Sequence, residues 1–287
     1  MVNDASREEI LSSTTALPIR EVKLERQMGP AAARNEGLKR AANPYILFLD
    51  ADMVLPHQSI DWIRDTLELY SHRPDVAGVL GVYAETVPWK DFYSNFKNLY
   101  TCFLYNSTET QSPFLHTPIF CVKKDVLKAA GGFDPDLATA EDFRLGLLLG
   151  TQGHRFIIDR RIQGTHLKRY SLASILREDF RRTRDLGKIK LQGAQRKFYY
   201  RAHRWHRLIS LLLPGPILIL SLLSFWNARL PWVVVFFLAV FYLCNLRFLM
   251  YCRRVRGLAF ALKAAAFLFI EMLWAEVCVV GLTSRSK

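Results

Sequence analysis

Cysteine is scarce in this chain of 287 residues, and the few cysteines are not arranged in pairs. The five are scattered and odd in number, and none stands in a Cys-x-x-Cys motif. This argues against a disulfide framework and against a cysteine-ligated zinc site. No signal peptide is visible, since the N-terminus is polar and mixed in charge. No internal repeat is evident. These absences fit a soluble part that faces the reducing cytosol.

Acidic residues are scarce in one segment of an otherwise mixed chain. Residues 160–207 contain fifteen Lys and Arg against three acids, and they supply most of the net charge of +13. Such a run is most often a solvated face. No helix-turn-helix, zinc finger or aromatic RNA-binding pattern accompanies it, so we exclude nucleic acid as a partner. The segment precedes an apolar stretch, which favours a cytoplasmic membrane surface as its partner, with a diphosphate or lipid phosphate as second choice.

Long apolar stretches are confined to the C-terminal region, where we expect a membrane domain over residues 208–287 with two to three transmembrane helices. The stretches are 208–226, 231–250 and 258–282. Each is long enough to cross the hydrocarbon core. The third contains Lys263, Glu271 and Glu276, which would need partners inside a membrane. The basic loop at residues 253–256 is predicted to be cytoplasmic, which places the soluble domain on the same side.

The part before residue 200 alternates between helical and strand patterns. Helices are expected at 6–16 (with Ser6 as N-cap), 30–42, 58–71 and 123–130, and strands at 19–24, 45–50, 76–83, 119–122 and 155–159. Such alternation predicts an α/β domain with a mostly parallel sheet. Residues 88–105 carry aromatic side chains at spacings of three and four, which indicates one apolar helical face. That face either packs in a core or lies against lipid.

One buried strand ends abruptly in two acids. Residues 45–52 read Tyr-Ile-Leu-Phe-Leu-Asp-Ala-Asp, and the apolar run suits a strand covered on both faces. Because side chains alternate along a strand, Asp50 and Asp52 would point the same way at its carboxyl end, where open α/β sheets bind ligands. Two carboxylates there form an oxygen site suited to Mg²⁺ or Mn²⁺, which could hold a diphosphate. The alternative is a solvated loop after a core strand.

Four segments, in this order and spacing, resemble the family 2 glycosyltransferases of the GT-A fold. They are V-N-D-A-S (2–6), G-P-A-A-A-R-N (29–35), the D-A-D that ends the strand (50–52), and G-G-F-D (131–134) followed by E-D (141–142). The resemblance covers roughly residues 2–185 and implies a Rossmann-like GT-A domain over residues 1–200. The family fold opens with a strand and a helix that residues before Val2 do not supply. We therefore expect the domain to be incomplete at its N-terminus.

The donor side of the site follows from this resemblance. Asp4, Arg34, Asp50 and Asp52 are expected to bind a nucleotide-diphosphate sugar, and Asp52 and Asp50, with His166 completing the shell, to hold Mg²⁺ or Mn²⁺. Simpler roles stay open for three of these residues. Asp4 could be a turn residue, Arg34 could close its helix over the sheet, and a lone histidine such as His166 is more often structural.

The acceptor side is predicted to lie at residues 141–142. By resemblance, Asp142 is the candidate general base and Glu141 its catalytic neighbour. Both precede an apolar helix, whose dipole would favour their charged forms and keep their pKa values low. The alternative for Asp142 is N-capping of that helix. A single in-line displacement with one base implies inversion at the anomeric carbon.

These observations predict a membrane-anchored, metal-dependent, inverting glycosyltransferase. Its multi-pass anchor would lie in the cytoplasmic membrane, with the catalytic domain in the cytoplasm and a lipid-linked or cell-envelope glycan as acceptor. Processive polysaccharide synthases of the family carry a Gln-x-x-Arg-Trp motif that is not met around Arg204-Trp205, so transfer of one sugar is favoured. A processive synthase, or a non-catalytic membrane scaffold derived from a transferase, are the alternatives.

Overall fold

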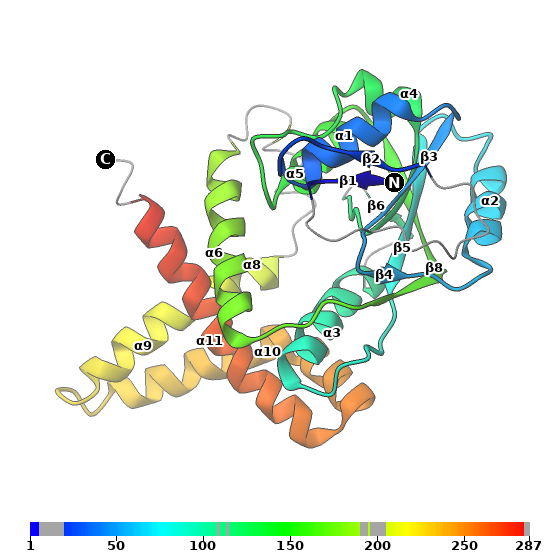
Figure 1. The fold of residues 1–287 in the computed structure, drawn as a ribbon. Coiled ribbons are helices and arrows are strands. Elements are labelled where there is room, and N and C mark those ends of the chain that lie inside the picture. The colour runs from blue at the N-terminus through cyan, green and yellow to red at the C-terminus, as the bar shows by residue number, and fades with distance from the viewer. Residues whose placement is uncertain (6–19, 108–109, 113–114, 190–194, 196–204, 284–287) are drawn as a thin grey trace. The chain divides into compact units, whose positions relative to one another are not determined.

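The computed structural model describes residues 1–5, 20–107, 110–112, 115–189, 195 and 205–283 (Figure 1). Their contacts divide the chain into two compact units. Unit 1 consists of Met1–Val82 with Thr108–Gly164, and unit 2 of Tyr83–Ser107 with Thr165–Lys287. The two units interleave along the chain, whereas the sequence interpretation divided it once, between residues 200 and 208.

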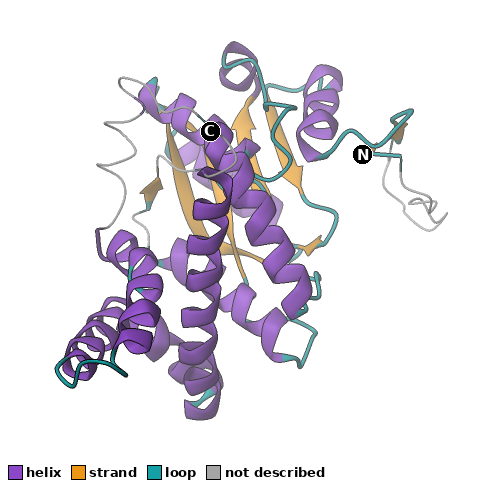
Figure 2. Ribbon diagram, turned by 90° about the vertical axis from the view of Figure 1, so that its left-hand side faces the viewer, coloured by secondary structure: helices purple, strands orange, loops and turns teal. Residues whose placement is uncertain are grey.

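Unit 1 is built on a six-stranded sheet, whose strands lie side by side in Figure 2. The strand order is β3-β7-β5-β8-β4, and β6 pairs with β8 off this path. The bounds are β3 Tyr45–Leu49, β4 Met53–Val54, β5 Val76–Tyr83, β6 Gln111–Ser112, β7 Ile119–Lys123 and β8 Arg155–His166. Every residue of β5 is buried, as its unbroken apolar run predicts for a central strand.

The prediction of a mostly parallel sheet is wrong for the strands around β7. This strand runs antiparallel to both neighbours, with Leu49 opposite Ile119 on β3 and Gly78 opposite Val122 on β5. A parallel pair needs a crossover helix packed on the sheet. The helix that follows β5, α3 (Phe92–Asn106), packs in unit 2 instead. β5 and β7 are therefore free to pair antiparallel.

Two short strands near the N-terminus form a sheet of their own. β1 (Val2–Asn3) pairs in parallel with β2 (Val22–Lys23). β2 lies within the strand predicted at 19–24. The helix predicted at 6–16, with Ser6 as its N-cap, lies outside the described residues. β3 is the end strand of the larger sheet. Within the described residues it pairs on one side only, and its Tyr45 and Leu49 are 36% and 45% exposed.

In the described part of unit 1 there are four helices, and each lies close to a predicted one. They are α1 Pro30–Arg40, α2 Ser59–Leu69, α4 Lys124–Ala129 and α5 Glu141–Thr151. α1 starts where Gly29 adopts φ 89° and Pro30 occupies the first helical turn. Proline suits that position because its missing N–H would have no helical partner there. The carbonyl of Ala41 after α1 accepts a hydrogen bond from the Lys124 ammonium at 2.6 Å.

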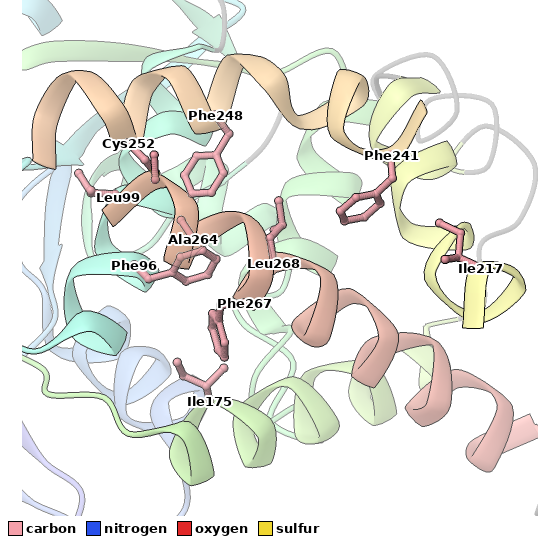
Figure 3. Close-up of a cluster of buried hydrophobic side chains, with 11 residues drawn as sticks. Phe96, Leu99, Ile175, Ile217, Phe241, Phe248, Cys252, Ala264, Phe267 and Leu268 are labelled. Carbon is pink, nitrogen blue, oxygen red and sulfur yellow. The ribbon is translucent and has the colours of Figure 1, made fainter. Parts of the chain in front are cut away.

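Unit 2 consists of helices around a buried apolar cluster (Figure 3). Its helices are α3, α6 Leu172–Lys188, α8 Trp205–Leu212, α9 Pro214–Leu223, α10 Leu230–Arg256 and α11 Leu258–Thr283. Phe96 and Leu99 of α3 are fully buried in this cluster, where Phe96 contacts Phe248 of α10 and Phe267 of α11 at ring-centroid distances of 5.7 and 4.8 Å. The aromatic face of residues 88–105 is therefore a packed core face, the first of the two alternatives.

Within the described residues of unit 2, two helices are long and apolar enough to cross a membrane. They are Leu230–Arg256 and Leu258–Leu282, with mean hydropathies of 2.2 and 2.0. The stretch predicted as a span at 208–226 is not one helix, because α8 ends at Leu212 and α9 begins at Pro214. A proline inside a helix removes a hydrogen bond and clashes with the preceding turn. Two prolines in this stretch account for the break.

The two acids on α11 have partners, as charges in an apolar helix require. Glu271 accepts a hydrogen bond from the Lys97 ammonium at 2.7 Å, and the same ammonium contacts Asp179 of α6 at 3.1 Å. Burial lowers the pKa of Lys97, but the two carboxylates beside it outweigh burial and raise it above its usual value of 10.5. Glu276 accepts from the backbone N–H of Gly215.

Candidate active site

One arginine of unit 1 joins the two predicted halves of the site. The guanidinium of Arg34, on α1, donates Nη2 to Oδ1 of Asp50 at 2.8 Å and Nη1 to Oε1 of Glu141 at 2.6 Å. Asp50 directly follows β3, and Glu141 is the first residue of α5. Three segments that lie far apart in the sequence are thus held by one side chain. Arg34 and Glu141 side chains are 12% and 7% exposed, and Asp50 is 33% exposed.

The guanidinium of Arg34 also rests on an aromatic ring. Its carbon lies 5.5 Å from the ring centroid of Phe133, which itself packs edge-to-face on Phe48 of β3. A cation over an aromatic face gains electrostatic attraction. The ring therefore fixes the plane in which the arginine presents its two donors.

The neighbouring residue, Asn35, fixes Phe133 through the backbone. Its side chain donates Nδ2 to the carbonyl of Phe133 at 2.7 Å and accepts the N–H of Phe133 at 2.8 Å. The two hydrogen bonds form a clamp between α1 and the loop before α5. Sequence reasoning gave no role to Asn35 or Phe133, although both lie inside the motifs that carried the family resemblance.

The two glycines before Phe133 are explained by the same clamp. Gly131 and Gly132 have φ of 82° and 78°, a region that other residues rarely adopt. A Cβ on Gly132 would also lie 2.5 Å from Oδ1 of Asn35. The Gly-Gly pair thus allows the chain to turn and to approach α1 closely.

The position of Asp50 is set by the sheet. Its backbone N–H donates to the carbonyl of Pro118, which extends the β3–β7 ladder by one residue, and its carbonyl accepts from Met53 in the turn that follows. Asp52 lies in this turn and is half-buried. Both acids are therefore held at the end of β3, as predicted, and Asp50 is neither a solvated loop residue nor fully buried.

Glu141 and Asp142 lie in the first turn of α5, as expected, but neither is its N-cap, which is Ala140. Burial first, and then the charge of Asp142, raise the pKa of Glu141 above its usual 4.5, while Arg34 opposes the rise. The expectation of a low pKa is therefore wrong for Glu141, since burial outweighs the helix dipole. Oδ1 of Asp142 accepts the N–H of Phe143 at 2.7 Å, and Oδ2 has no hydrogen-bond partner in the described part of the chain.

Asp4 supports the entry to α1. Its two carboxylate oxygens accept the N–H groups of Met28 and Gly29, each at 2.7 Å. The next residue, Ala5, has φ 55°, in the left-handed region that residues other than glycine rarely adopt. Asp4 therefore stabilises a turn, which was the simpler of its two expected roles. A contact between Asp4 and a nucleotide stays a prediction.

The predicted metal ligands are not all brought together. Across the residues that the structure describes, no three His, Cys, Asp or Glu side chains converge as a metal-binding group. His166 belongs to unit 2, where it is buried with its ring 4.7 Å from that of Tyr83. Asp50 and Asp52 alone fit Mg²⁺ or Mn²⁺, since such ions often take one or two carboxylates and complete their shell with water and substrate phosphates.

Comparisons with known proteins bear on the family and the fold. Residues 1–131 match the family model described as Glycosyl transferase family 2, and a search of curated proteins gave no significant match. Among solved structures, the mannosyltransferase PcManGT from Pyrobaculum calidifontis, in complex with GDP-Man and Mn²⁺, is 20% identical. It aligns over 89% of this chain and 69% of its own with a TM-score of 0.53, which shows a shared fold.

Two further structures align less closely. S. aureus TarS 1–349 in complex with UDP is 16% identical over 90% of this chain and 81% of its own, with a TM-score of 0.42. GalNAc-T7 with UDP, GalNAc and Mn²⁺ is 16% identical over 53% of this chain and 32% of its own, with a TM-score of 0.39. Residues 1–131 thus match the glycosyl transferase family 2 model, and the chain shares the GT-A fold.

Proposed function

We propose that this protein is a membrane-anchored, inverting glycosyltransferase that uses a nucleotide-diphosphate sugar. The donor class is supported by the family match and by PcManGT, which shares the fold and was solved with GDP-Man and Mn²⁺. The acceptor is a lipid-linked or cell-envelope glycan, and the catalytic domain is cytoplasmic. The anchor consists of α10 and α11, and the basic residues at the end of α10 favour a cytoplasmic loop between them.

The observation that carries the proposal is the double ion pair of Arg34. It joins Asp50, on the predicted donor side, to Glu141, next to the predicted base. A buried cation that holds two carboxylates from different elements fixes their separation. Transfer between two substrates requires such fixed positions, because orientation of the reacting groups supplies much of the rate enhancement.

Asp142 acts as the general base in this scheme. Its Oδ2 takes the proton from the acceptor hydroxyl, whose oxygen forms a bond to the anomeric carbon of the donor. The bond between that carbon and the diphosphate oxygen breaks, and the nucleoside diphosphate leaves with the electron pair. Attack from the face opposite the leaving group inverts the anomeric configuration. Glu141 is a positioning residue, since its oxygen is bound to Arg34.

Asp52 and Asp50 are the residues that would hold Mg²⁺ or Mn²⁺. Such an ion, when bound, neutralises charge that develops on the departing diphosphate. Arg34 helps to keep the Asp50 carboxylate in place from the other side. Asp4 and Arg34 complete the proposed nucleotide side.

The test is sugar transfer by isolated membranes supplied with a panel of nucleotide sugars and Mn²⁺. Asp52→Ala and Asp142→Asn should abolish turnover at unchanged protein level, with a loss of about 10²–10⁴-fold for the base. Asp125→Asn is the matched control, because Asp125 is also an acid in the first turn of a helix, α4, and is exposed. Equal activity of Asp142→Asn and wild type would overturn the assignment of the base.

Product analysis separates the proposal from its rivals. One added sugar with inverted anomeric configuration, read by NMR, supports the proposal, and a long polymer would favour a processive synthase. Absence of turnover with every donor, in protein that is folded and membrane-bound, would favour a non-catalytic scaffold.

A further inference from the structure

Among the described residues, no ion-pair or hydrogen-bond partner is found for Lys263, unlike the two other charged residues of α11. Glu271 contacts Lys97, and Glu276 accepts the N–H of Gly215. Lys263 is exposed and forms no ion pair or hydrogen bond with any residue of the chain as described. An ionised side chain inside a membrane-length helix normally pairs with an opposite charge. A ligand from outside the chain can therefore supply the anion for Lys263.

A groove within unit 2 supplies the rest of such a site. It has a volume of about 450 Å³ and is lined by Lys263, by Arg256 at the end of α10, and by Lys90 just before α3. No acidic side chain lines it. The nearest acid in sequence, Asp91, caps α3 by accepting the N–H of Ser94 and lies 3.6 Å from Arg169. Arg256 also donates to the backbone carbonyl of Glu85 at 3.2 Å, while the Glu85 carboxylate bonds Tyr251 and Arg254. The three cations are thus not balanced by a carboxylate among the residues that line the groove.

Aromatic rings form the apolar wall of the same groove. Phe92 of α3 and Phe260 of α11 lie with ring centroids 5.1 Å apart. Trp89 is fixed beside them, because its indole N–H donates to the carbonyl of Leu167 and the Arg169 guanidinium lies over its ring. Aromatic side chains of this kind favour the interface between membrane and water. The groove therefore offers charge and apolar surface together.

With α10 and α11 across the bilayer, as proposed above, the groove would lie at the depth of lipid phosphates. α10 and α11 meet at Gly257, so this turn reaches the membrane surface if both helices span the bilayer. Lys263 lies five residues after Leu258, or about 7.5 Å along the helix. A lysine stem can extend its ammonium over that distance to the headgroup layer. The first turn of α11, which favours anions, contributes Ala259 to the lining.

We propose that this groove binds the phosphate of an anionic membrane lipid through Lys90, Arg256 and Lys263, with the lipid chain along Phe92 and Phe260. The proposal rests on the membrane location given above but on no step of sugar transfer. The proposed site uses none of the carboxylates of unit 1, and it would fix the α10–α11 turn at the membrane surface.

Lipid adducts on the full chain, purified in detergent, test this proposal by native mass spectrometry. The protein is supplied with equal amounts of phosphatidylglycerol and phosphatidylcholine, and wild type should retain the anionic lipid preferentially. Arg256→Gln and Lys263→Gln should each reduce its retention about fivefold, which is the effect of one cation near a membrane surface. Lys263→Arg should restore it. Arg253→Gln, which removes an exposed charge from the same helix end but outside the groove, should change nothing.

Three outcomes would overturn the proposal. An equal loss in Arg253→Gln would mean a diffuse surface charge effect. Displacement of the lipid by excess inorganic phosphate, with the phosphate itself bound, would mean a site for the free anion. Release of the protein from membranes by alkaline carbonate would refute the membrane location and the lipid site together. Donor turnover is measured on the same preparations, so a failure of the transferase assignment is recognised separately, since Asp142→Asn should leave lipid retention unchanged.

Discussion

Removal of the Arg34 charge tests the organisation of the site most directly. Arg34→Met keeps an apolar stem above Phe133 but removes both ion pairs, to Asp50 and to Glu141. Glu141 is then left as a buried acid without its cation, and its second oxygen, Oε2, already has no hydrogen-bond partner among the residues that the structure describes. The substitution should therefore lower stability as well as activity.

The size of the effect follows from burial. Loss of one partner from a buried ion pair costs about 3–5 kcal/mol. The lower end applies here, because Asp50 is one-third exposed and water screens its charge, and because Glu141 can become neutral by taking up a proton. A loss of about 3 kcal/mol corresponds to a fall in Tm of about 6–12 °C for a protein of this size class.

The effect should depend on pH in a defined direction. Burial holds the pKa of Glu141 above its usual 4.5 in the folded protein, so its ionisation opposes folding as pH rises above that value. Arg34 reduces this penalty in wild type. The Tm difference between Arg34→Met and wild type should therefore grow as pH rises from about 4.5 toward neutrality, and it should shrink again in acid.

Thermal unfolding followed by intrinsic fluorescence, over a series of pH values, measures both effects. Arg40→Met is the matched control, since it breaks the exposed pair with Glu36 on the same helix and should shift Tm by less than about 2 °C. The double variant Arg34→Met/Glu141→Gln should recover part of the loss. Equal Tm values for Arg34→Met and Arg40→Met at neutral pH would refute the reasoning.

Three further predictions concern stability at buried positions. Gly132→Ala, at φ 78° and with its Cβ 2.5 Å from Asn35, should cost about 1–3 kcal/mol, and a Tm equal to wild type would contradict the clamp. Lys97→Met leaves the carboxylates of Asp179 and Glu271 without their cation, whereas Glu271→Gln keeps the pair between Lys97 and Asp179. The Tm in detergent should therefore fall further in Lys97→Met than in Glu271→Gln. Phe96→Ala, at a fully buried position, should cost about 3–5 kcal/mol, which denaturant titration in detergent would detect.

Local patterns predicted most elements of unit 1 but not their pairing. The apolar run at 76–83 became β5 at its predicted bounds, and the Ala-rich run after Gly29 became α1. The antiparallel direction of β7 could not be read from this pattern, because it depends on where the intervening α3 packs. That helix is buried by α10 and α11, about 150 residues later in the chain.

The candidate site was predicted residue by residue, but the contacts between residues were not. Asp50 and Glu141 were chosen from motifs 91 positions apart, and nothing local to either motif shows that Arg34 binds both. The hydrogen bonds between Asn35 and Phe133 could not be predicted either, since they depend on a backbone turn at Gly131 and Gly132. The raised pKa of Glu141 follows from burial, a quantity that emerges only when the fold closes around it.

Within the described residues, one side of β3 has no strand partner. An end strand with free backbone groups is a template on which another extended chain can add. This edge runs from Tyr45 to Leu49, both with exposed side chains, and it stops one residue before Asp50. A strand laid along it would therefore end beside the carboxylate that anchors Arg34. With the donor bound at Asp50, as proposed above, self-association through this edge would compete with the donor, so turnover per molecule should fall as the protein concentration rises.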